Sequence, residues 1–132
     1  MARKLEHDLS DLKDRVLRMG SLVEDAIRKS ISALVDRDRA LALAVIDGDS
    51  IINTHDVEIE EECIRLLAIW QPTGSNLRFI TTAIKIITDL ERMGDLAVDI
   101  CERTIELMDE PQLKPYIDIP RMAEASQKML KD

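Results

Sequence analysis

The chain has 132 residues, a formal net charge of −8 and a pI near 4.8. This length fits a single domain with its own core, and the acidic balance excludes a protein that holds nucleic-acid phosphates by electrostatic attraction. Aromatic residues make up 2% of the chain and charged residues 33%, and there are only four glycines and four prolines. These values exclude a β-sandwich or barrel, which needs more turn residues, and predict an all-α protein.

The chain shows no signal for a membrane or for secretion. No apolar stretch reaches the roughly 20 residues that cross a bilayer, and the N-terminus, Met-Ala-Arg-Lys-Leu-Glu-His-Asp, lacks the apolar core of a signal peptide. We therefore expect a cytoplasmic protein without direct membrane insertion. In that compartment Cys63 and Cys101, which fall on apolar seams, are expected to be reduced and buried.

The first expected helix covers residues 5–34. Its apolar residues recur at alternating spacings of four and three, the heptad pattern of helices that pack nearly parallel or antiparallel. Gly20 within this stripe suggests a close helix contact. Asp36 and Asp38 follow the helix, and either can cap the next one. The stripe consists of Leu5, Leu9, Leu12, Val16, Met19, Val23, Ala26 and Ser30.

The second expected helix covers residues 39–70, and the third covers residues 76–108. Pro72 in the short turn between them ends the second helix, and Ser75 is predicted to be the N-cap of the third. Both helices carry an apolar seam that is interrupted by acidic residues. The seam of the second helix is Ala42, Val45, Ile52, Ile59, Cys63, Leu66 and Trp70, with Asp49 and Asp56 in its gaps. The seam of the third is Leu77, Ile80, Ile84, Ile87, Gly94, Val98, Cys101 and Ile105, with Glu91 in its gap.

Short links make consecutive helices antiparallel neighbours, so the expected fold is an antiparallel three-helix bundle about 45 Å long. Prolines then mark a linker over residues 111–118. A fourth helix is expected to begin near Ile119, and it stops within its apolar pattern at Asp132. We interpret this as a truncated fourth helix of a longer protein; the alternative is a helix that packs on another chain.

Two groups of acidic residues are predicted to meet between the second and third helices. At 100° per residue, Asp49, Asn53, Asp56 and Glu60 span about 60° of one helix, and Glu91, Asp95 and Asp99 span about 80° of the other. If the turn centres near Thr73, opposite residues have numbers that sum to about 146. This register places Glu91 near Asp56 and Asp95 near Ile52.

Carboxylates in a packed seam destabilise it unless they are paired, protonated or bound to a cation. Their oxygen atoms suit magnesium, manganese or iron. Two other interpretations stay open: a solvated acidic face, or internal salt bridges to Arg92 or Lys85. The candidate metal ligands are Glu91, Asp95, Asp99, Asp49 and Asp56.

Nothing in the sequence indicates an enzyme. There is no Glu-x-x-His pair of the kind used by di-iron helical bundles, no glycine-rich phosphate loop, and no Ser/His/Asp set that the spacing supports. A narrow rod of helices also offers no evident pocket. We therefore expect a function that is exerted by binding.

Residues 70–102 resemble the PhoU family of regulators of phosphate signalling and uptake. The resemblance rests on the Gln-Pro-x-x-x-x-Leu-Arg turn from Gln71 to Arg78 and on the Asp-Leu-Glu-Arg-x-Gly-Asp run from Asp89 to Asp95. Residues 5–19 and 45–52 also resemble the family. The resemblance implies a bundle similar to a spectrin repeat. Residues 1–110 would form the first three-helix repeat, 111–118 a linker, and 119–132 the start of a second repeat.

The resemblance also implies a function. Family members repress the phosphate regulon when phosphate is plentiful, and are thought to link a phosphate ABC transporter, through its ATPase subunit, to a sensor histidine kinase. A metal binds at their Glu/Asp-x-x-x-Asp motifs, here Glu91 to Asp95 and on to Asp99. Iron is expected, with zinc, manganese and magnesium as alternatives.

Two departures from the family affect these expectations. Full members have about twice this length, so a half-length chain is expected either to pair as a homodimer that rebuilds a six-helix body or to bind partners poorly. Asn53 and Asn76 stand where Asp is common, which favours one metal ion over a cluster. The alternative function is a helical-bundle interaction protein without metal dependence.

Overall fold

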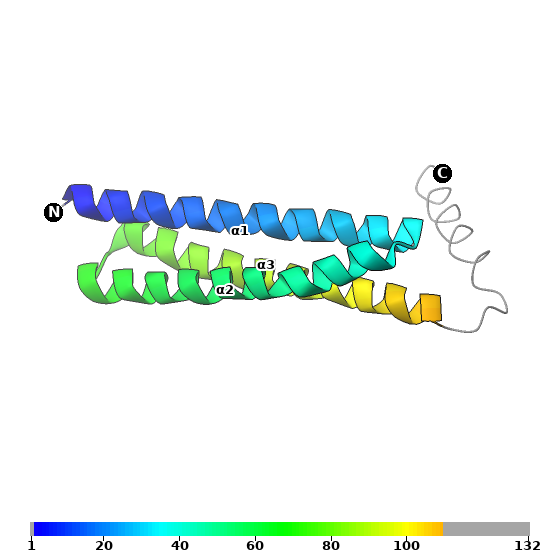
Figure 1. Ribbon diagram of the computed structural model, residues 1–132. Helices are drawn as coiled ribbons and strands as arrows, with labels where there is room; N and C mark the ends of the chain where they lie inside the picture. Colours follow the sequence, from blue (N-terminus) through cyan, green and yellow to red (C-terminus); the bar gives the residue numbers. More distant parts are fainter. Residues whose placement is uncertain (1, 110–132) are drawn as a thin grey trace, which may run out of the picture.

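Three long helices lie side by side and form a rod (Figure 1). In the computed structural model, which describes residues 2–109, the helices are α1 (Ala2–Asp36), α2 (Arg39–Trp70) and α3 (Gly74–Asp109). All three pairs of helices are in contact, and α2 runs antiparallel to both of its neighbours. The predicted all-α, antiparallel three-helix fold is confirmed. The expected linker over residues 111–118 and the truncated fourth helix over residues 119–132 lie outside the described residues.

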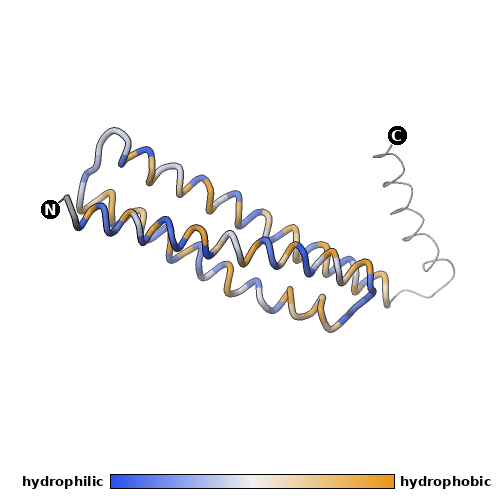
Figure 2. Tube along the Cα trace, turned by 90° about the horizontal axis from the view of Figure 1, so that it is seen from above, coloured by the Kyte–Doolittle hydropathy of each residue, from blue (hydrophilic) through white to orange (hydrophobic). Residues whose placement is uncertain are grey.

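The apolar seams form a core in two parts, and apolar segments, drawn in orange, recur along all three helices of the rod (Figure 2). The larger part occupies the end that carries the α2–α3 turn, and the smaller part occupies the other end. Cys63 belongs to the larger part and Cys101 to the smaller, and both are buried free thiols, as expected. The larger part contains Leu12, Met19, Val23, Ile52, Ile59, Cys63, Leu66, Ile80, Ala83 and Ile87, and the smaller contains Ala33, Ala42, Val45, Ala97 and Cys101.

The two links have different local chemistry. Asp38 caps α2, because its side chain accepts a hydrogen bond from the backbone N–H of Leu41 at 3.1 Å. At the other end of α2, Gln71 adopts a left-handed conformation with φ 45°, and its N–H donates to the carbonyl of Leu67 at 3.2 Å. Helix α2 is also tied to α1 here, since the indole N–H of Trp70 donates to Asp8 at 3.1 Å.

Two predictions about the start of α3 are wrong. Ser75 is not the N-cap, because the helix begins one residue earlier, at Gly74, whose φ of 61° turns the chain into the helix. Leu77 is not a core residue either, and 39% of it is exposed. It lies at the end of the rod, one turn before Ile80, the first buried residue of α3.

None of the helices within residues 2–109 is long and apolar enough to span a membrane.

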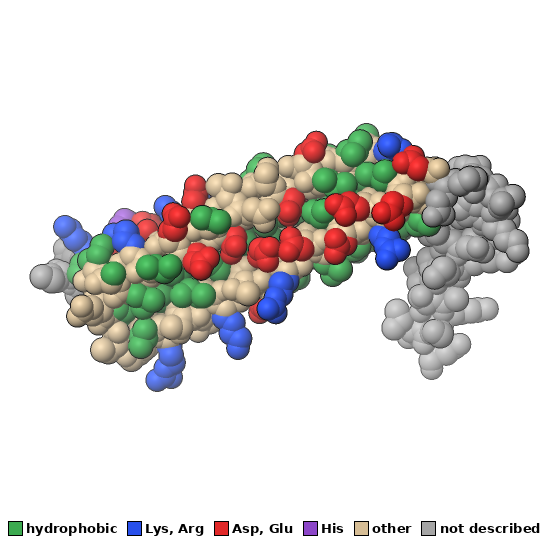
Figure 3. Space-filling view, turned by 90° about the horizontal axis from the view of Figure 1, so that it is seen from below, with side chains coloured by type: hydrophobic (Ala, Val, Ile, Leu, Met, Phe, Trp, Pro, Cys, Tyr) green, Lys and Arg blue, Asp and Glu red, His purple; other side chains and the backbone are tan. Residues whose placement is uncertain are grey.

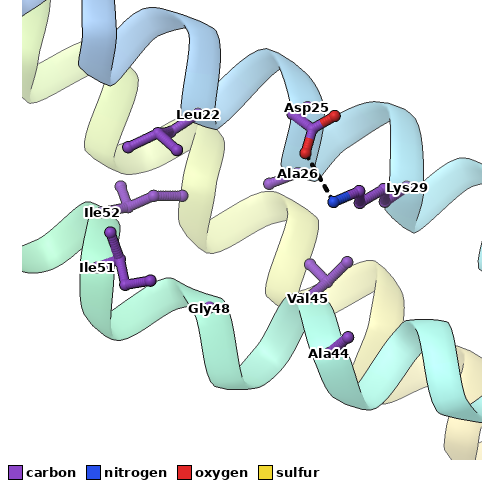
Figure 4. A pocket seen from close by; sticks show the side chains of 9 residues that line it. All are labelled: Leu22, Asp25, Ala26, Lys29, Ala44, Val45, Gly48, Ile51 and Ile52. Carbon is purple, nitrogen blue, oxygen red and sulfur yellow. Dashed lines mark ion pairs between the residues drawn. The ribbon is translucent and has the colours of Figure 1, made fainter.

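Two glycines are expected to respond oppositely to replacement by alanine. Gly48 lies inside α2 beside a groove next to α1 (Figure 4), and a Cβ added there meets nothing within 4 Å. Gly48→Ala is therefore expected to raise the free energy of unfolding by about 0.5–1 kcal/mol, because alanine loses less backbone entropy in a helix. Gly74 has equally open surroundings but a left-handed backbone. Gly74→Ala is expected to lower the free energy of unfolding by about 1–2 kcal/mol.

Urea denaturation of both variants and the original protein measures the two effects. Because neither added methyl group has a neighbour, a loss of stability in Gly48→Ala, or no loss in Gly74→Ala, contradicts the backbone assignment at that position.

Candidate metal centre

Helices α2 and α3 pack closely where their seams are interrupted by acidic residues. Gly94 of α3 faces α2, and a Cβ added to it would lie 3.4 Å from Cγ2 of Ile52 and 3.5 Å from Oδ1 of Asp49. The residue numbers of Gly94 and Ile52 sum to 146, so the predicted register is confirmed. Because Gly94 has no side chain, the carboxylate of Asp49 can lie directly against the backbone of α3.

Asp49 has one carboxylate oxygen without a partner. Its Oδ1 is buried and accepts no hydrogen bond, whereas its Oδ2 accepts one from Nδ2 of Asn53 at 3.3 Å. A buried acceptor that is left unpaired costs about 1–3 kcal/mol, and more when it is charged. Nothing within residues 2–109 compensates this oxygen, which is therefore available to a cation.

Four carboxylates act on one another at this level of the rod. We refer to Asp49, Asp56, Glu91 and Asp95 as the acidic cluster. Burial and the negative charge of Asp95 raise the pKa of Asp49, against the hydrogen bond from Asn53, which lowers it. Burial is also the main cause that raises the pKa of Asp56, and the negative charges of Glu60 and Asp95 raise it further.

Glu91 joins the acidic cluster from the other helix. A hydrogen bond shared with Asp95 is the main cause that raises its pKa, followed by burial and by the charges of Asp95, Asp56 and Asp49. The carboxyl groups of Asp49, Asp56 and Glu91, with their raised pKa values, therefore hold a proton more readily than an ordinary carboxyl group. Each raised pKa means that the negatively charged form of the carboxyl group is unfavourable at this place.

Four of the five predicted ligands, Asp49, Asp56, Glu91 and Asp95, lie near enough to one another for their charges to interact. Asp99 is the exception: it is exposed, and its charge is not among the causes that raise the pKa of Asp49, Asp56 or Glu91. It lies one turn beyond Asp95, towards the smaller part of the core. Acidic side chains continue along this face of the rod, over α2 and α3 (Figure 3).

No basic residue neutralises the acidic cluster within residues 2–109. Arg92 and Lys85, the two candidates named from the sequence, are exposed, and neither forms an ion pair with its carboxylates. The interpretation of this region as internal salt bridges has no support here. Asp95 is exposed while Asp49, Asp56 and Glu91 are half-buried, so the region is not a fully solvated acidic face either.

The donor set fits a hard cation, although its side chains are not gathered at coordination distance. Over the described part of the chain, no three His, Cys, Asp or Glu side chains lie close enough together to hold one ion. The fit rests on the unpaired Oδ1 of Asp49 and on the oxygen chemistry of its neighbours. A bound cation would offset the unfavourable negative charge of these carboxylates.

Sequence reasoning missed two contributions to this arrangement. Gly94 appeared only as one seam position, although a glycine inside a helical seam is a signal for close approach of a neighbouring helix. Asn53 appeared only as a lost negative charge, whereas in the structure it donates the one hydrogen bond that Asp49 accepts.

The chain is similar in sequence to proteins of one family. The family model described as "PhoU domain" matches residues 16–104, which cover more than half of α1, all of α2 and most of α3. The chain is 45% identical over 129 residues to the phosphate-specific transport system accessory protein PhoU homolog of Aquifex aeolicus, an alignment that covers 98% of this chain and 58% of the relative.

Other relatives show the same pattern. A PhoU homolog 2 of Thermotoga maritima is 37% identical over 99% of this chain and 56% of its own length. The accessory protein PhoU of Escherichia coli K12 is 34% identical over 95% of this chain and 52% of its own length. The chain thus spans a little over half the length of these relatives. Each is named as an accessory protein of a transport system, in agreement with the prediction that this chain is not an enzyme. Because the family model matches residues 16–104, more than half of the chain, the chain belongs to the PhoU family.

Proposed function

We propose that this chain is a PhoU-type regulatory adaptor in phosphate homeostasis. It negatively regulates phosphate-starvation signalling and phosphate uptake, and it does so in the cytoplasm by linking a phosphate ABC transporter, through its ATPase subunit, to a sensor histidine kinase. The observation that carries the proposal is the identity of 37–45% over 98–99% of the chain to two proteins named as accessory proteins of phosphate-specific transport. An adaptor of this kind acts by binding, which suits a rod of three helices.

The proposal includes self-association. Several large apolar side chains of the rod are more than half exposed, among them Val35, Ile64 and Ile69. Exposed apolar side chains of this kind favour burial against another chain.

The proposal also includes one bound metal ion. Asp49, Glu91 and Asp95, with Asp56 beside them, would hold it through carboxylate oxygens, and Asp99 would extend the site along α3. Iron is the expected metal, with manganese, magnesium and zinc as alternatives. The ion would neutralise the acidic cluster and fix the register of α2 against α3, and its role would be structural.

The regulatory role is tested in cells that carry the chain in their native gene. Deletion of the gene is expected to raise expression of a phosphate-starvation reporter in phosphate-rich medium, because the restraint on the sensor kinase is lost. Reintroduction of the gene is expected to restore repression. Unchanged reporter expression in the deletion strain, with normal induction in phosphate-poor medium as the control, contradicts the proposed role.

The metal site is tested with Glu91→Ala combined with Asp95→Ala. The original protein, purified without chelator, is expected to contain metal, and saturating metal at about 100 times its dissociation constant adds about 2.7 kcal/mol to the free energy of unfolding. The double variant is expected to lose both effects.

A matched control removes one aspartate and one glutamate from exposed positions of the same helix, Asp89→Ala with Glu106→Ala. Elemental analysis measures the metal content of both double variants, and thermal unfolding measures their stability. Equal metal content in the two double variants contradicts the ligand assignment.

Asp49→Asn distinguishes the metal site from the alternative, a helical-bundle interaction protein without metal dependence. Because the pKa of Asp49 is raised in the folded protein, its ionised carboxylate lowers the free energy of unfolding when the pH is above that pKa. This destabilisation disappears as the pH falls to the ordinary pKa of an aspartate, about 4. In chelator-treated protein, Asp49→Asn is therefore expected to increase the free energy of unfolding at pH 7 by about 1 kcal/mol. The gain is expected to shrink towards pH 4.

With metal present at pH 7, the same substitution removes a ligand and is expected to lower the free energy of unfolding. Urea denaturation with chelator and with metal measures this change of sign. A gain of similar size under both conditions supports the metal-independent alternative. Asp49→Leu, which fills the seam with an apolar side chain, is then expected to stabilise the rod as well.

A further inference from the structure

A second surface of the rod lies between α1 and α3, near the α2–α3 turn, and is lined by residues outside the acidic cluster. It is a cleft of about 420 Å³. Three of its apolar side chains are substantially open to solvent: Leu17 is 59% exposed, Ile86 41% and Phe79 37%. We refer to this cleft as the α1–α3 groove. Its apolar lining consists of Val16, Leu17, Phe79, Ala83 and Ile86.

Two basic side chains border the α1–α3 groove. Lys13 comes from α1 and Arg78 from α3, and neither forms an ion pair with another residue in the part of the chain that the structure describes. The stretch over residues 71–88, which supplies the α3 side of the groove, contains no acidic residue; its charged residues are Arg78 and Lys85. The groove is therefore bordered by positive charge on a chain whose net charge is −8.

The charge distribution along the rod is correspondingly uneven. On the face shown in Figure 3, acidic side chains are most numerous over the middle and the right-hand part of the described rod, whereas basic, acidic and apolar side chains are mixed at the left-hand end, which carries the α2–α3 turn. The positive border of the α1–α3 groove is complementary to a partner that carries negative charge. Such complementarity selects a partner and its orientation.

We propose that the α1–α3 groove is a docking site for an acidic amphipathic helix of a partner protein. Apolar side chains spaced three and four residues apart on that helix enter the groove over Leu17, Phe79 and Ile86, as in other helix-in-groove complexes. Carboxylates beside this stripe pair with Lys13 and Arg78. The hydroxyl groups of Ser75 and Thr82, which also line the groove, are available to polar groups of the helix.

The charges argue against two other occupants. Residues 110–132 of this chain carry four acidic and four basic residues, and so do not match a groove with a positive border. A second copy that pairs its own groove about a two-fold axis would bring Lys13 and Arg78 towards their equivalents, and like charges oppose such contact. A separate acidic helix meets neither obstacle.

The test uses a synthetic 18-residue peptide with leucines spaced three and four residues apart, glutamates beside the leucine stripe and alanines elsewhere. The full chain, labelled with ¹⁵N, is titrated with this peptide. Amide shift changes are expected at residues 13–17 and 75–86 and are expected to be absent around the acidic cluster.

Lys13→Glu combined with Arg78→Glu is expected to weaken binding of the peptide about tenfold. Arg18→Glu with Arg103→Glu, the same charge change at exposed positions outside the groove, is expected to leave it unchanged.

Several results would overturn the proposal. The peptide could cause no amide shift changes, or shift changes centred on residues outside the groove. The peptide could also bind the Lys13→Glu, Arg78→Glu variant and the original protein with equal affinity. A protein whose dimer dissociates on Lys13→Glu with Arg78→Glu, as measured by sedimentation, would assign the groove to a second copy instead. Loss of binding to phosphatidylglycerol vesicles in that variant, without peptide binding to the original protein, would assign it to a membrane. The proposal does not rest on phosphate regulation or on metal, so its failure leaves the proposed function intact.

Discussion

The close packing of Asp49 against Gly94 is the constraint on which the candidate site depends. Apolar clusters lie on both sides of this contact, one built around Ile52, Ile59 and Ile87 and the other around Val45 and Cys101. Because both clusters lock α2 to α3, the helices cannot slide to separate the carboxylates between them. The gap in the apolar core and the acidic cluster therefore lie at the same place between α2 and α3 and have the same cause.

This feature works against the stability of the metal-free bundle. An unpaired carboxylate oxygen and three carboxyl groups with raised pKa values replace what would otherwise be continuous apolar packing. Departures from the rules of stable packing concentrate at functional sites, where a ligand supplies the missing interaction. We propose a cation for this role, because its charge and coordination preferences match carboxylate oxygens.

The rod separates two surfaces of opposite character. The acidic cluster lies between α2 and α3, whereas the α1–α3 groove is apolar, bordered by Lys13 and Arg78, and placed towards the α2–α3 turn. In an adaptor, two such surfaces can select different partners, because each repels the charge that the other attracts. A helical bundle provides this arrangement directly, since each pair of neighbouring helices creates its own groove.

The sequence alone determined the three helices, the antiparallel register and the level at which Asp56, Asp95 and Glu91 meet. Helical periodicity and short turns are sufficient for this, because they fix which residues share a face and which lie opposite one another. Only the tertiary structure decided that Oδ1 of Asp49 lacks a partner, that Asn53 donates to the other oxygen, and that Asp99 stands apart. It also decided the α1–α3 groove. These features depend on rotamers and on how two helices distant in sequence pack, which periodicity along one helix does not specify.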